Sequence, residues 1–243
     1  MNRLRDLCGR VMSTEDLSDA TTDCQVLRIA FSPPEQVRSR RVVTRSRFRP
    51  TGKYPSWKMK RMLQWESINE LNAFRLLDCD PRVKAFTEQP CEIVYFDGTE
   101  TRHHYPDIYV EIDSDQELWE VKAECEASES EVSTRTELLT SGLRRYGFTY
   151  RVVLDHELAK EPRLGNAKAL LRYGRRAASD NECEYVRLAL KSKGHLSWSE
   201  VCRGVLGIHG REIICRLVLE GVLTFDMKSS FAPDTQFLEG RNH

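Results

Sequence analysis

The sequence lacks several patterns that would assign it to a familiar class. Its eight cysteines include no C-x-x-C pair and no cysteine–histidine pair at zinc-finger spacing, which excludes a zinc module of that kind. It has no run of about eighteen apolar residues, and the first 23 residues contain no apolar run long enough for a signal peptide. We therefore expect reduced, scattered core thiols, no membrane contact and a cytoplasmic location.

The net charge does not indicate a class of binding partner either, because 37 basic side chains balance 37 acidic ones. The charges are unevenly placed, however: residues 38–61 hold ten Lys or Arg and no acid, whereas residues 111–131 hold nine acids and one lysine. Aromatic residues among the cations favour contact with nucleic-acid phosphates and sugars, although a solvated face has the same composition. We expect an extended, loop-like course there, with these DNA-binding candidates: Arg45, Arg47, Arg49, Lys53, Lys58, Lys60 and Arg61.

A chain of 243 residues with 40% hydrophobic residues is long enough for two cores. We expect an irregular or partly helical arm over residues 1–35, a first domain over 36–160 and a second over 161–243. In the first domain, apolar spacing predicts helices over 63–77 and 128–146, and strands over 83–87, 91–96, 101–104, 107–112, 118–123 and 150–154. This order predicts an α/β fold with a mixed sheet flanked by helices.

The second domain has a different pattern, with helices predicted over residues 167–176, 182–191, 197–205 and 212–220 and then a hairpin that returns at Phe231. Ser197 and Glu200 have the spacing of a capping box. Helices followed by a hairpin predict a smaller, mainly helical, winged-helix-like domain, a shape that serves both DNA binding and protein docking. Arg211 and Arg216 lie on the helix that would read DNA, but the glutamates between them favour docking to protein.

Four residues far apart in the sequence form a candidate catalytic set: Glu70, Asp107, Glu120 and Lys122. Glu120 and Lys122 are two residues apart, so on a strand they share a face, and the neighbouring strand would bring Asp107 beside them. Phosphodiester cleavage uses a hard cation with oxygen ligands, which the three carboxylates and the main-chain carbonyl of Val121 would supply. Lys122 would stabilise charge or position the attacking water. The alternative is a surface hairpin with an ion pair.

Pro106-Asp107 followed by Glu120-Val121-Lys122 is the pattern of the PD-(D/E)xK nucleases. It occurs with further short segments in a fixed order: S-I-N-E at 67–70, L-L-D at 76–78, E-Q-P at 88–90 and Y-P-D-I at 105–108. Over residues 35–155 the chain therefore resembles TnsA, the endonuclease subunit of heteromeric bacterial transposases that cuts the 5′ ends of the element.

This resemblance implies a restriction-endonuclease-like fold and a site in which Glu70, Asp107 and Lys122 act with Mg²⁺, for which Mn²⁺ would substitute. It also implies double-stranded DNA at transposon ends as the substrate. The partners implied are a TnsB-like DDE transposase subunit and a TnsC-like AAA+ regulator, and the gene would belong to a bacterial mobile element.

Several residues near the candidate catalytic set have two possible roles. Glu66 shares the predicted helix face with Glu70, and only the resemblance favours Glu70. Gln89 is an accessory residue near the metal by analogy with the family, or it pairs with main chain. His104 is an accessory phosphate contact, or it belongs to a solvated turn. Position 120 can be Gln in the family, so Glu120 adds an acid ligand and brings the site closer to the restriction-enzyme pattern.

Two other functions stay open at this point. The same nuclease core occurs in free-standing restriction or repair nucleases and junction resolvases, which act without partners. In a non-catalytic DNA-binding or assembly protein, the winged helix would carry the function and the acids would be surface residues.

Overall fold

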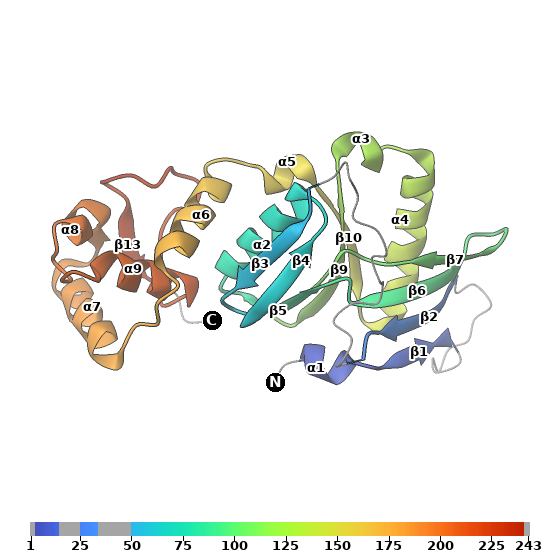
Figure 1. Ribbon diagram of the computed structural model, residues 1–243, viewed down its shortest axis with the longest axis horizontal. Helices are drawn as coiled ribbons and strands as arrows, with labels where there is room; N and C mark the ends of the chain where they lie inside the picture. Colours follow the sequence, from blue (N-terminus) through green and yellow to red (C-terminus); the bar gives the residue numbers. More distant parts are fainter. Residues whose placement is uncertain (1–2, 15–24, 34–49, 241–243) are drawn as a thin grey trace. The chain divides into compact units, whose positions relative to one another are not determined.

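The computed structural model describes residues 3–14, 25–33 and 50–240, and its internal contacts divide the chain into two units (Figure 1). The first unit comprises Met1–Leu71 and Val83–Leu158, and the second comprises Asn72–Arg82 and Ala159–His243. Within the described ranges, no helix combines the length and the apolar character needed to cross a bilayer.

The first unit contains two four-stranded sheets. One is antiparallel throughout and has the order β1-β2-β6-β7, with β1 (Val11–Ser13), β2 (Val26–Phe31), β6 (Cys91–Phe96) and β7 (Thr101–His104). The other has the order β10-β9-β8-β5, with β5 (Val83–Glu88), β8 (Ile108–Ile112), β9 (Asp115–Lys122) and β10 (Thr149–Leu154). The second sheet is mixed, because β10 is parallel to β9 while its other pairs are antiparallel.

A helical crossover joins the parallel strands β9 and β10, as such a pair requires. It consists of α3 (Glu124–Ala127), α4 (Ser130–Leu143) and the short 3₁₀ helix η2 (Arg144–Tyr146), and α5 (Asp155–Leu158) follows β10. Gly147 ends the crossover with a φ of 82°, which glycine adopts without steric cost. Helix α4 packs on β2 and β10, and its Leu139 and Leu143 belong to the buried core. Sheets flanked by helices in this way are compatible with a restriction-endonuclease-like fold.

The N-terminal region is part of the first unit and not a separate arm. After helix α1 (Arg3–Leu7), strand β2 pairs with β6, and its Val26, Ile29 and Phe31 are buried in the core. The prediction of an irregular or partly helical arm is wrong here, because the partner of β2 lies some 65 residues away in the sequence, as the pair Ile29–Ile93 shows. A local pattern does not contain that information.

The described part of the basic stretch forms a β-hairpin, which corrects the prediction of a loop. Strand β3 (Gly52–Ser56) pairs with β4 (Arg61–Trp65), and Tyr54 lies opposite Leu63, with both side chains buried. The predicted helix over 63–77 is correspondingly shorter, since α2 is Ile68–Cys79. The local cause is Ser67, whose hydroxyl accepts from the N–H of Glu70 and so starts the helix at that point.

Besides residues Asn72–Cys79 of α2, the described part of the second unit contains four helices and a small antiparallel sheet. The helices are α6 (Arg163–Tyr173), α7 (Asp180–Lys193), α8 (Trp198–Cys202) and α9 (Gly210–Leu219). The strands are β11 (Leu196–Ser197), β12 (Leu223–Thr224) and β13 (Gln236–Glu239), in the order β11-β13-β12. The return strand is β13 and not the segment at Phe231, because Phe231 packs into an aromatic cluster with Trp198, Phe225 and Phe237. The winged-helix assignment stays a prediction.

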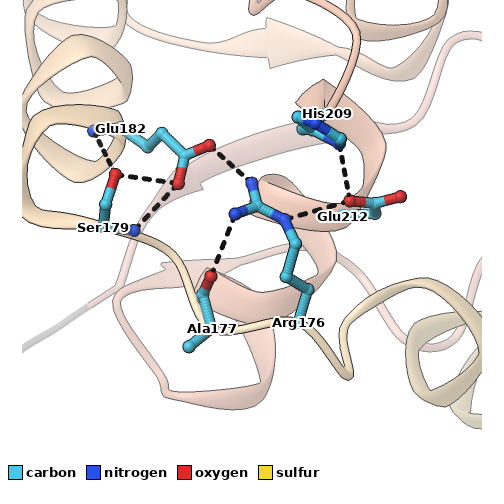
Figure 2. Close-up of polar contacts among 6 residues, drawn as sticks. All are labelled: Arg176, Ala177, Ser179, Glu182, His209 and Glu212. Atoms are coloured by element: carbon cyan, nitrogen blue, oxygen red, sulfur yellow. Dashed lines mark hydrogen bonds and ion pairs between the residues drawn. The ribbon is translucent and has the colours of Figure 1, made fainter.

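Ion pairs link the start of α7 to the start of α9 within the second unit (Figure 2). Ser179 and Glu182 form a capping box, and the carboxylate of Glu182 also accepts from Arg176. The same guanidinium donates to Glu212 at 3.1 Å, and Glu212 lies 3.0 Å from the Nδ1 atom of His209. Every carboxylate in this group therefore faces a cation or a donor.

A second capping box begins α8, as the sequence predicts. Ser197 accepts from the N–H of Glu200, and Glu200 accepts from Ser197 and pairs with Lys193 at 2.7 Å. On α9, Arg216 pairs with Glu220 at 2.6 Å.

Candidate active site

Asp107 lies directly before β8 and is fixed against β9. Its N–H donates to the carbonyl of Trp119 at 2.9 Å, and its Oδ2 atom accepts from the N–H of Val121 at 2.7 Å. The structure therefore brings Asp107 beside the strand segment that carries Glu120 and Lys122, as the spacing predicts.

Glu120 and Lys122 share a face of β9, and their side chains contact each other at 3.0 Å between Nζ and Oε1. Glu120 is buried, with 4% of its surface exposed, and two further donors surround its carboxylate. The Nε2 atom of His104 lies 3.3 Å from Oε2, and the Nη2 atom of Arg135 lies 3.5 Å from Oε1. The hydroxyl of Tyr150 is 3.0 Å from the same His104 nitrogen.

Glu70 occupies the first turn of α2, where it takes part in capping the helix. Its Oε1 accepts from the hydroxyl of Ser67 at 3.0 Å, and its Oε2 accepts from the N–H of Glu66 at 2.9 Å. These two hydrogen bonds hold both carboxylate oxygens of Glu70 at the start of the helix. Glu66 precedes the helix, which corrects the expectation that the two glutamates share a helix face.

Gln89 lies between these elements and has an unusual backbone. Its φ is 40°, a left-handed conformation that costs a residue with a Cβ atom on the order of 1 kcal/mol. Its N–H donates to the carbonyl of Asp107 at 2.8 Å, and its Nε2 donates to Glu66 at 3.1 Å. Gln89 thus connects the chain at Asp107 with the segment that precedes α2.

The carboxylates of the site titrate abnormally. Burial raises the pKa of Asp107 well above its ordinary value, and the negative charges of Glu120 and Glu70 raise it further. Burial acts to raise the pKa of Glu120 as well. The contacts with His104 and Lys122 outweigh it, so the pKa of Glu120 is lowered overall. Burial lowers the pKa of Lys122, and the nearby carboxylates of Glu120 and Asp107 more than reverse it. Lys122 and Glu120 are therefore charged, while Asp107 holds its proton more tightly than usual.

These residues fit a hard cation in donor type and charge, but not in spacing. Among the described residues, no three His, Cys, Asp or Glu side chains are arranged to hold a metal as they stand. Two buried oxygens are poorly satisfied by the described residues: Oε1 of Gln89 accepts no hydrogen bond, and Oε2 of Glu120 has only Nε2 of His104, 3.3 Å away. Such acceptors cost roughly 1–3 kcal/mol each. A divalent cation would give them a partner and would offset the repulsion that raises the pKa of Asp107.

The surroundings of Glu120 contain two residues that the sequence analysis missed, Arg135 on α4 and Tyr150 on β10. His104 is buried against Glu120 and Tyr150, so it is not in a solvated turn. Each of the three comes from a different element around β9. No spacing rule in the sequence connects them, and only the order of strands and the crossover helix bring them together.

The candidate DNA-binding cations differ in their surroundings. Arg45, Arg47 and Arg49 lie outside the described residues. Arg61 forms a two-pronged contact with the buried Glu88, at 2.6 and 3.1 Å, which holds the β3–β4 hairpin to β5. The remaining cations are on the hairpin: Lys58 lies 5.9 Å from the ring centroid of Trp57, while Lys53 and Lys60 are exposed and form no ion pair with described residues.

The mixed sheet places Asp107, Glu120 and Lys122 at the adjoining ends of two strands within a helix-flanked unit, an arrangement compatible with a restriction-endonuclease-like fold. Residues 80–155 match the family described as "TnsA-like endonuclease N terminal". The matched segment contains Gln89 and these three residues but not Glu70. The predicted resemblance to the TnsA-like endonucleases is thus confirmed for this segment. No curated protein matches the chain.

Proposed function

We propose that this protein is a metal-dependent DNA endonuclease of the TnsA type, which cuts the 5′ strand at transposon ends as part of a heteromeric transposase. The observation that carries the proposal is the juxtaposition of Asp107, Glu120 and Lys122 inside the matched segment. Asp107 is held against β9 by the 2.7 Å hydrogen bond from Val121, and Lys122 lies 3.0 Å from Glu120. Both contacts support a catalytic site rather than a solvated surface hairpin.

Glu70, Asp107, Glu120 and the main-chain carbonyl of Val121 would hold Mg²⁺, and Mn²⁺ would substitute for it. When bound there, the cation would supply a Lewis acid for phosphodiester hydrolysis. Lys122, kept charged by its acidic neighbours, stabilises the negative charge that develops on the phosphate and positions the attacking water. Ser67 keeps Glu70 in place through the 3.0 Å hydrogen bond.

DNA would lie along the basic stretch, where Lys53 and Lys60 offer exposed ammonium groups to phosphates. A TnsB-like DDE subunit would make the 3′ cut and a TnsC-like AAA+ regulator would control the assembly. The second unit would dock to one of these partners. The complex would act in the bacterial cytoplasm.

The test is an incubation of the purified protein with a plasmid that carries the element ends, with and without candidate partner subunits. Mg²⁺, Mn²⁺ and a chelator are compared for the wild type, Asp107→Ala and Lys122→Ala, and a plasmid without the ends is the control. We expect divalent-dependent 5′ nicks at the ends with the wild type. For each variant we expect a loss of at least about 100-fold, because even outer-shell partners of a metal contribute 10–100-fold. Full activity of Asp107→Ala would rule out the site.

A second candidate function is a free-standing nuclease with the same core. The acid at position 120 favours it, since Glu120 adds a carboxylate that the restriction-enzyme pattern uses. Sequence-defined cutting of a plasmid by the purified chain without partners would support this alternative. Calorimetry with Mn²⁺ distinguishes both from a non-catalytic protein, which would give no carboxylate-dependent heat.

A further inference from the structure

Arg135 has a place in the candidate site that a purely structural role does not explain. It projects from α4 towards β9, and its Nη2 lies 3.5 Å from Oε1 of Glu120, the oxygen that Lys122 already contacts at 3.0 Å. The Nε–H of Arg135 is buried and finds no acceptor among the described residues.

Two permanent cations converge on one oxygen of Glu120. Its Oε1 contacts Nζ of Lys122 at 3.0 Å and lies 3.5 Å from Nη2 of Arg135, so the two cations repel each other. If the only role of Arg135 were to stabilise Glu120, a neutral hydrogen-bond donor at this position would do so without repelling Lys122. A desolvated guanidinium N–H without an acceptor adds a further free-energy cost. Both costs would be offset by an additional anion that reaches this point of the site.

Access from the surface is available at the same side chain. Arg135 is 18% exposed and lines a cavity of about 320 Å³ with residues of β6, the β6–β7 turn and the first turns of α4. Two carboxylates border this cavity, and that of Asp97 is already bound by Arg102 and Thr99. Arg135 therefore lies between an open cavity and the carboxylate of Glu120.

We propose that Arg135 is a second cationic residue of the active site and donates to a non-bridging oxygen of the phosphate being cut, with Glu120 holding its guanidinium in place. This inference rests on the proposed nuclease function. Phosphate is the anion whose geometry suits a guanidinium, because two N–H groups can donate to two oxygens at once. Lys122 and Arg135 would then share the charge of the phosphate between them.

The experiment measures single-turnover cleavage by the full chain with its partner subunits and Mg²⁺. It compares the wild type with Arg135→Gln, Arg135→Lys and the control Arg102→Gln, an exposed arginine on the same cavity. We expect Arg135→Gln to slow cleavage about 10²–10³-fold, the loss typical of one donor to a transition state. Arg135→Lys should recover part of the rate, and Arg102→Gln should stay near the wild type.

A phosphorothioate at the cut position separates substrate contact from a structural role. Sulfur in place of the contacted oxygen should slow the wild type and add little to the defect of Arg135→Gln, because the contact is already lost. An equal slowing by sulfur in both proteins would overturn the proposal. If Arg135→Gln fails to fold by circular dichroism, the same comparison is made with Arg135→Lys. If the wild type cuts no substrate, the proposed function fails; if the wild type and Arg135→Gln cut equally, only the present inference fails.

Discussion

Three helices of this protein start with the same Ser-x-x-Glu sequence, but their glutamates face different surroundings. In the second unit, Glu182 is bonded to Arg176 (Figure 2) and Glu200 to Lys193, and these contacts lower both pKa values to about 2. In the first unit, Glu70 caps α2 through Ser67 but lies near Asp107, whose pKa it helps to raise. The sequence motif starts a helix in all three places. Whether its acid serves stability alone depends on what the carboxylate faces.

The largest expected effect comes from removing the negative charge of the motif glutamate, at Glu70 in the first unit and at Glu200 in the second. Glu70→Gln should lower Mg²⁺-dependent cleavage by at least about 100-fold, because it removes a carboxylate that would hold the cation. Glu200→Gln changes the same atoms in a neutralised environment and should leave the cleavage rate unchanged. Both rates are measured on the plasmid with element ends. Equal losses in the two variants would remove the distinction between the motifs.

A smaller effect is expected from the serines. Ser67→Ala and Ser197→Ala each delete a capping hydroxyl and should each cost about 1 kcal/mol of helix stability. Only Ser67→Ala should also slow cleavage, by about 10-fold, because Ser67 orients Glu70 as an outer-shell partner. Chemical denaturation and nicking assays on the same preparations measure the two quantities. A cleavage defect in Ser197→Ala would show that capping alone accounts for the loss.

The smallest expected effect concerns the pH dependence of stability, which should have opposite signs in the two units. The folded-state pKa of Asp107 is raised, so the folded protein keeps a proton that the unfolded chain releases near pH 4. Its contribution to stability is greatest below that pH and falls as the pH rises towards the folded value. Glu182 and Glu200 have lowered pKa values, so their contribution is present above about pH 4.3 and is lost as the pH falls towards about 2.

Hydrogen exchange of peptides from β9 and α7 reports the two units separately. Without divalent cations, Asp107→Asn should slow exchange in β9 relative to the wild type, and increasingly so as the pH rises from 4 to 7. Mg²⁺ should reduce that difference, since a cation relieves the repulsion in the wild type. Peptides from α7 serve as the internal control. No divergence between wild type and variant in β9 would contradict the raised pKa.

Much of the fold of the first unit was predictable, because its elements have strong local periods. The apolar runs of β6 and β8, the short buried run of β10 and the helical spacing of α4 all indicate the elements found. The hairpin of β3 and β4 was missed because its charges and its Arg-Pro and Thr-Gly pairs resemble a loop, although the buried Tyr54 and Leu63 lie between exposed neighbours. The pairing of β2 with β6 was missed because it depends on residues far apart in the sequence.

In the candidate site, too, some residues were predictable from the sequence and others were not. The shared face of Glu120 and Lys122 follows from the two-residue period of a strand, and the adjacency of Asp107 follows from the next strand in the chain. The shell formed by His104, Arg135 and Tyr150 does not follow from any period, because it depends on where β7, α4 and β10 lie around β9. A spacing rule therefore finds the acids and the lysine but not the groups that set their charge.

The left-handed backbone of Gln89 has a consequence for engineering. A design procedure that chooses the least strained residue for each φ and ψ would put glycine at position 89. Removing this backbone strain would favour a higher melting temperature. The resulting protein would also have lost the amide that tethers Glu66. Thermostable versions of this protein should therefore be built by changing other positions, with Gln89 and its left-handed backbone retained.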